Sequence, residues 1–255
     1  QITLPTHQPS WMPPINLNHF AHMVDNFGLV QFARLNQPDY DSGYTLDDNA
    51  RALVACLWLG NYFPHLRPQI TPYLSIFINF ISTCLSGKDK FINYLHKDQH
   101  THSDQNYTEN IDDSIGRAFW ALASLKTSSW FDDQAIQLQA DQLLAKSLPL
   151  VQQVSNPRAI ATCILGLSIL YETGDAKYFT PLKQFADQLV KLYQTNATST
   201  WAWFEPQLTY TNGIFPAALF AAGRATKHTP YTNIANRTLQ FLTNTCFYGD
   251  IYVPI

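Results

Sequence analysis

Two pairs of adjacent aspartates, each followed by an arginine, are the residues of this chain whose types and spacing best suit chemistry. Asp47-Asp48 precedes Arg51 and Asp112-Asp113 precedes Arg117, and a run of apolar residues follows in both cases. The pairs begin 65 positions apart, at 47 and 112, a suitable length for one repeat of a helical hairpin. Such acids can cap a helix and pair with an arginine four residues later. One cap needs one carboxylate, so two doublets also predict acids clustered around a common mouth.

Glu205 is a third acidic residue in an aromatic setting, because it directly follows Trp203 and Phe204. Aromatic rings stack on the CH faces of sugars, carboxylates bind sugar hydroxyls, and two carboxyl groups together can cleave a glycosidic bond. The candidate catalytic residues are therefore Asp48, Asp113 and Glu205. The apolar neighbours of Glu205 would favour its protonated form, so we expect it to be the general acid, with Asp48 or Asp113 as the base. The alternative is a loop carboxylate that only binds nearby backbone N–H groups.

Further residues on the same segments would line a sugar-binding cleft around these acids. Three arginines, Arg51, Arg117 and Arg158, are expected to hold the carboxylates in place. The residues expected to bind the sugar are Tyr44, Asp47, Arg51, Glu109, Asp112, Arg117, Trp203, Tyr210 and Asn212.

Metal and cofactor chemistry have less support in the sequence. His96, His100 and His102 lie in one segment with Asp98 and Asp104, and these residue types can bind a metal ion. A flexible polar loop is the preferred interpretation, so we expect no metal and no cofactor. The four cysteines are widely spaced and form no CxxC pair, which predicts buried free thiols. The chain has neither a Gly-rich phosphate loop nor a Gly-x-Ser-x-Gly motif, which disfavours nucleotide-dependent and serine-nucleophile chemistry.

The elements that would position these residues are predicted to be helices. The chain has 255 residues, of which 46% are hydrophobic and 14% charged, and we expect one core-rich domain over residues 1–255. Strand-like alternation is not seen, so the predicted fold class is all-α. Apolar residues recur three and four positions apart through the segments 48–60, 70–85, 113–125, 134–148, 158–172, 180–194, 213–225 and 231–245.

These segments alternate in composition, which predicts their arrangement. The first of each pair is rich in small and apolar residues, whereas the second mixes in Lys, Gln and Asp. A helix that is apolar on nearly every side must be enclosed, and a helix with a polar face must lie outside. We therefore expect an (α/α) toroid or barrel of helical hairpins, incomplete at about four hairpins. Its last inner helix would have an apolar flank, which a second copy or further hairpins would cover.

Several motifs in the same order resemble a bacterial α/α-toroid domain that is similar to six-hairpin glycosidases and often fused to GT-B-type glycosyltransferases. The resemblance spans about residues 17–225. It implies a toroid fold, a carbohydrate ligand and site residues within the matching motifs. Residues 43–53 (GYTLDDNARAL) resemble the GYxxDDNARAL signature of that family, and the other similar segments are 17–20 (LNHF), 25–33 (DNFGLVQFA), 91–94 (FINY), 112–122 (DDSIGRAFWAL), 157–159 (PRA), 165–167 (LGL) and 203–212 (WFEPQLTYTN).

The chain also departs from the family pattern. Thr211 stands where the family has an acidic residue, and Asp112-Asp113 stands where it has Glu-Asp. The family continues with further helices that carry a Gly-rich, Gln-Gln-Pro-containing motif, which this sequence lacks.

Three functions follow from these observations. The first is a glycoside hydrolase-like protein that acts on an oligosaccharide by carboxylate acid/base catalysis. The departures from the family favour an alternative, a non-catalytic module that binds a glycan for a glycosyltransferase. A sugar epimerase or isomerase ranks last, because the enclosed helices supply no histidine base.

The expected partners are a glycan and either a glycosyltransferase domain or the remaining hairpins of a toroid. A net charge of −3 without a basic run disfavours nucleic acid, and no apolar segment approaches the ~18 residues of a membrane span. The N-terminus lacks signal-peptide features, but a cleaved signal would leave no trace, so the compartment stays open.

Overall fold

A computed structural model describes residues 13–85, 90–99 and 103–253 of the chain. It confirms the all-α fold class, and every expected helix is present with ends within three residues of the prediction. The long helices are α2 (Leu46–Tyr62), α3 (Arg67–Cys84), α5 (Asp112–Lys126), α6 (Gln134–Val151), α7 (Pro157–Glu172), α8 (Phe179–Asn196), α9 (Ile214–Thr226) and α10 (Thr229–Cys246).

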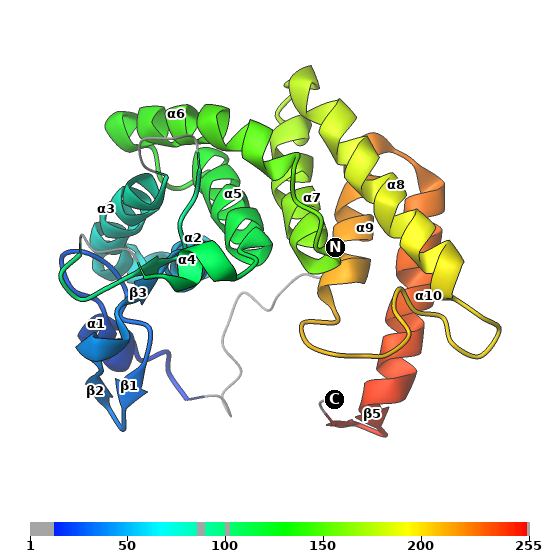
Figure 1. The fold of residues 1–255 in the computed structure, drawn as a ribbon, viewed down its shortest axis with the longest axis horizontal. Helices are drawn as coiled ribbons and strands as arrows, with labels where there is room; N and C mark the ends of the chain where they lie inside the picture. Colours follow the sequence, from blue (N-terminus) through cyan, green and yellow to red (C-terminus); the bar gives the residue numbers. More distant parts are fainter. Residues whose placement is uncertain (1–12, 86–89, 100–102, 254–255) are drawn as a thin grey trace.

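The long helices form two rows. Helices α2, α5, α7 and α9 each pack against the next, and α3, α6, α8 and α10 cover them from outside in an arc (Figure 1). The apolar α7 is buried along most of its length, whereas α8 buries one face only, as their compositions predict. We call α2, α5, α7 and α9 the inner helices. Closure of such rows into a toroid stays a prediction.

Local sequence signals start two of the inner helices, α2 and α7. Thr45 caps α2, because its hydroxyl accepts a hydrogen bond from the backbone N–H of Asp48 at 3.1 Å. Asn156 caps α7 in the same way, and Pro157 follows at the first helical position. Gly60 in α2 lets the indole of Trp130 approach closely, since a β-carbon there would lie 2.1 Å from the ring. The caps therefore fix where α2 and α7 begin, and Gly60 sets how closely Trp130 packs on α2.

Short elements connect the long helices. They are α1 (Asn18–Met23), α4 (Gln105–Thr108), the 3₁₀ turns Tyr40–Ser42, Pro64–Leu66 and Ala176–Tyr178, and the strands β1 (Ala33–Arg34), β2 (Gln37–Pro38), β3 (Tyr44–Thr45), β4 (Tyr94–Leu95), β5 (Phe247–Tyr248) and β6 (Ile251–Tyr252). The strands pair antiparallel as β1–β2, β3–β4 and β5–β6, with Ala33, Tyr44 and Phe247 opposite Pro38, Leu95 and Tyr252. These strands were not predicted, because two residues are too few for a visible alternation.

The core lies between the two rows and encloses the cysteines. All four are buried and unpaired, which confirms the predicted free thiols. Burial raises the pKa of Cys56 to about 12, because the interior disfavours a thiolate. Among the described residues, no helix is both long and apolar enough to cross a membrane.

Candidate functional site

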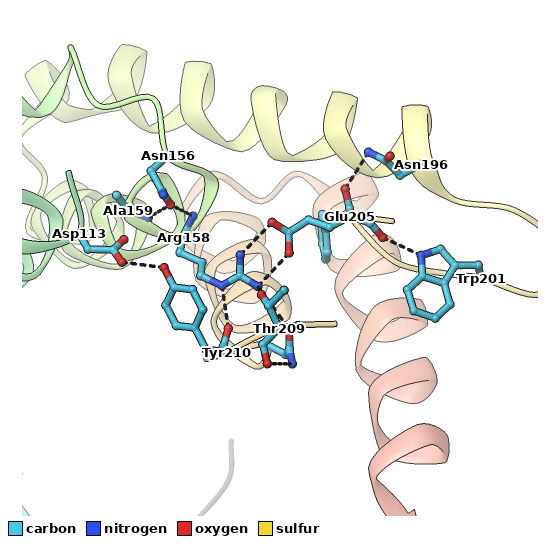
Figure 2. A network of polar contacts seen from close by, with 11 residues as sticks. Asp113, Asn156, Arg158, Ala159, Asn196, Trp201, Glu205, Thr209 and Tyr210 are labelled. Carbon is cyan, nitrogen blue, oxygen red and sulfur yellow. Dashed lines mark hydrogen bonds and ion pairs between the residues drawn. The ribbon is translucent and has the colours of Figure 1, made fainter. Parts of the chain in front are cut away.

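Polar contacts join residues at the amino-terminal ends of α2, α5 and α7. Arg117 of α5 pairs with Asp47 of α2, and the Tyr210 hydroxyl donates a hydrogen bond to Asp113 of α5 at 2.9 Å. Arg158 at the start of α7 then binds Glu205 and joins the loop 197–213 to the same set (Figure 2). Acids from both doublets and from the loop therefore lie along one end of the inner row. We call this end the carboxylate mouth.

Arg158 organises the loop. Its Nη1 and Nη2 atoms each donate to one carboxylate oxygen of Glu205 at 2.8 Å, and its Nε donates to the backbone oxygen of Tyr210 at 2.7 Å. Nη2 also donates to the hydroxyl of Thr209. The Arg158 side chain is only 7% exposed, so these bonds form largely away from water. The prediction that arginines hold the acids in place is confirmed for Arg158.

Tyr210 forms an exposed aromatic surface in a fixed position. Its ring centroid lies 4.5 Å from the Arg158 guanidinium carbon, and the residue remains 51% exposed. Burial of its hydroxyl and the hydrogen bond to Asp113 raise the pKa of Tyr210. The side chain of Asn212 closes the turn by accepting from the backbone N–H of Thr209, and Thr211 between them has a left-handed φ of 49°. Loop and ring are thus held together before any ligand arrives.

The first doublet is occupied by helix contacts. Asp48 accepts from the Thr45 hydroxyl at 2.6 Å and from Arg51 at 2.5 Å, one bond to each oxygen. Asp47 contacts both Arg51, at 3.5 Å, and Arg117. The sequence suggested that Arg117 pairs with the aspartate four residues before it, but its ion pair runs to Asp47 of the neighbouring helix.

The two aspartates of the second doublet bind different segments of the chain. Oδ2 of Asp112 accepts from the backbone N–H groups of Ser155 and Asn156 at 2.9 Å each, so it holds the segment before α7. Oδ2 of Asp113 accepts from Tyr210, and its Oδ1 has no hydrogen-bond partner among the described residues. Nearby, Glu109 accepts from the Tyr94 hydroxyl at 2.5 Å, and this bond raises the pKa of Tyr94.

Two aromatic residues expected to bind the sugar are inaccessible. Trp203 is 0% exposed and packs on Phe204 and Phe215, with ring centroids 5.4 and 6.0 Å away. Tyr44 is also buried, and its hydroxyl donates to Asp25 at 2.6 Å. Neither ring can stack on a sugar, because both are buried in the core, as large aromatic side chains often are.

The predicted role of Glu205 as a general acid does not fit its contacts. A general acid must carry a proton, whereas both oxygens of Glu205 accept hydrogen bonds from a guanidinium that is always charged. The oxygens of Asp48 are also both engaged. Of the three predicted catalytic carboxylates, only Asp113 has an oxygen without a hydrogen-bond partner among the described residues.

The site has no metal-binding cluster in the described part of the chain. Groups of three or more His, Cys, Asp or Glu side chains suited to a metal ion do not occur there. His100 and His102, two of the three histidines considered as ligands, lie outside the described residues.

No protein-family model and no curated protein matches this chain. The resemblance to the toroid family therefore stays a prediction.

Proposed function

We propose that this protein binds a glycan at the carboxylate mouth and holds it without an acid/base pair of its own. The single observation that carries this proposal is the Tyr210 ring, which is half exposed yet fixed by Arg158 on its face and by Asp113 at its hydroxyl. A ring already held in one position loses little conformational entropy when a sugar stacks on it. The resemblance to a glycosyltransferase-associated domain agrees with a binding role.

The environment of the ring suits a sugar. The open oxygen of Asp113 can accept a hydrogen bond from a sugar hydroxyl next to the stacked face. Arg117 lies one turn further along α5, where its ion pair with Asp47 keeps the mouth polar. Hydroxyls around the edge of a stacked sugar would thus find charged acceptors and donors at the ends of two helices.

Glycan binding by the wild-type protein and by the variants Tyr210→Ala and Asp113→Asn tests the proposal. A glycan array identifies the sugar, and titration calorimetry measures its affinity. Loss of the stacked ring should weaken binding about threefold to tenfold, as aromatic contacts contribute ~0.5–1.5 kcal/mol. Tyr107→Ala is the matched control, since Tyr107 is 72% exposed and its ring instead contacts Lys90. Equal affinities of the Tyr210 variant and the wild-type protein would refute the proposal.

A glycoside hydrolase is the second candidate, favoured by the open oxygen of Asp113 alone. Prolonged incubation of bound glycans followed by chromatography separates the two functions. Cleavage that disappears in Asp113→Asn would establish hydrolysis, whereas recovery of intact glycan supports binding. Asparagine keeps an acceptor for Tyr210, so the variant should fold normally.

A further inference from the structure

The exposed residues of the inner helices form stripes that continue inward from the carboxylate mouth. On α2 the stripe consists of Arg51, Ala55, Trp58 and Tyr62, spaced four, three and four residues apart. This spacing places them on one face of the helix. The stripe starts with the charged Arg51 and becomes aromatic at Trp58. The two residues are seven positions apart, about 10 Å along the helix axis.

Helix α5 repeats this pattern beside α2. Its partly exposed residues Asp113, Arg117, Trp120 and Ser124 follow the same four, three, four spacing. The two helices touch at both levels. Arg117 forms an ion pair with Asp47, one turn before Arg51 on α2, and further in the rings of Trp58 and Trp120 have centroids 5.9 Å apart. The stripes therefore form one surface that is charged at one end and aromatic at the other.

All four inner helices contribute to a groove at the aromatic end. It has a volume of about 590 Å³ and is lined by Trp58, Trp120, Ile169 of α7 and Phe220 of α9 among others. Gly213, the last residue of the loop that holds Tyr210, and Ile214, the first residue of α9, also line it. Arg224, the only charged residue among the described residues that line it, is paired with Glu172 at 2.7 Å. The groove thus begins beside the carboxylate mouth. Its aromatic and aliphatic residues form the larger part of the walls, and Ser124, Thr127 and Ser128 are among the polar ones.

We infer that this groove binds the apolar aglycone of a glycoconjugate whose sugar lies at the carboxylate mouth. The inference rests on the proposed function, because Tyr210 and Asp113 would hold the sugar. Volume favours a small ligand over a protein helix, since pockets of ~300–1,000 Å³ are typical of drug-sized molecules. Polarity fixes the direction, with hydroxyls toward Asp113 and Arg117 and the apolar chain toward Trp58 and Trp120.

Methyl and hexyl glycosides of the same sugars test this inference. With a panel of glucosides, galactosides and mannosides, we expect the hexyl form of the bound sugar to bind at least about tenfold more tightly, the effect of burying about two methylene groups. Quenching or a shift of tryptophan fluorescence should report it, because Trp58 is 54% exposed in the groove. Trp58→Ala should reduce the hexyl-to-methyl ratio below about threefold, and Ala217→Trp, which fills the groove from α9, should do the same.

Leu138→Ala is the matched control, since it removes a 59% exposed apolar side chain from α6, away from the groove. It should leave the ratio unchanged, and circular dichroism should show native helix content in all variants.

Each outcome bears on a different statement. Equal binding of methyl and hexyl glycosides would overturn this inference and leave the proposed function standing. A hexyl glycoside that binds no better than hexan-1-ol, with no binding of any methyl glycoside, would refute the sugar site and with it both statements. An unchanged hexyl-to-methyl affinity ratio in Trp58→Ala and Ala217→Trp would show that the hexyl group binds outside this groove, and it would also overturn the inference.

Discussion

Loss of the buried Arg158–Glu205 ion pair should destabilise the protein far more than loss of the exposed Arg224–Glu172 pair. In Arg158→Met the carboxylate of Glu205, whose side chain is 19% exposed, loses both of its charged donors. The carbonyl of Tyr210 loses a 2.7 Å hydrogen bond as well. Removing one partner of a buried pair typically costs ~3–5 kcal/mol, because the other charge stays uncompensated. We expect a loss in this range.

Arg224→Met is the matched control for this variant. Arg224 also makes two hydrogen bonds to one carboxylate, at 2.7 and 3.2 Å from Glu172, but its side chain is 61% exposed. Solvent screens such a pair, so its loss should cost about 0–1 kcal/mol. The two variants make the same substitution, but Arg158 is buried and also binds Tyr210 and Thr209, whereas Arg224 is exposed and binds Glu172 alone among the described residues.

Urea unfolding followed by circular dichroism measures both free energies, and thermal melts should show a decrease in Tm of roughly 6–20 °C for Arg158→Met. The double variant Arg158→Met/Glu205→Met should regain part of the loss, since no buried charge is left unpaired. If Arg158→Met and Arg224→Met cost the same, the idea that Arg158 organises the loop through a buried ion pair would be wrong.

Two further predictions concern the core. Gly60→Ala should destabilise the protein by ~1–3 kcal/mol, because its β-carbon would lie 2.1 Å from the Trp130 ring, whereas Gly213→Ala meets no atom within 4 Å and should be nearly neutral in the same urea assay. Burial raises the pKa of Cys56 from 9.0 to about 12, so the unfolded chain loses the thiol proton at a lower pH than the folded protein does. The contribution of Cys56 to stability should therefore fall as the pH rises from about 9 to 12. Reaction of Cys56 with a thiol reagent at pH 8 should accordingly require unfolding, and rapid labelling of the folded protein would contradict this.

Local patterns determined the helices of this protein. The spacing of apolar residues depends on the period of the helix, and caps such as Asn156-Pro157 act within one turn, so both can be detected in a short window of sequence. Alternation between enclosed and amphipathic segments likewise predicted which helices form the inner row. The pair Asp47–Arg51, four residues apart, followed from the same geometry, and the structure has it at 3.5 Å.

Contacts between distant residues were decided by the tertiary structure. Arg117 has aspartates available four residues away and on the next helix, and only the packing of α2 against α5 selects Asp47, 70 positions away. Arg158 and Glu205 are 47 positions apart, so their pairing, which removes Glu205 from the role of a proton donor, depends on the path of the loop.

The tertiary structure also determined which aromatic side chains of that loop are buried. Trp203 and Tyr210 are both aromatic and seven positions apart, yet one lies in the core and the other forms the exposed ring of the mouth. No helical or strand period connects them, because the loop 197–213 is irregular. The neighbours of each ring determine its burial. Phe215 and Phe241 surround Trp203, whereas Arg158 and Asp113 hold Tyr210 at the surface.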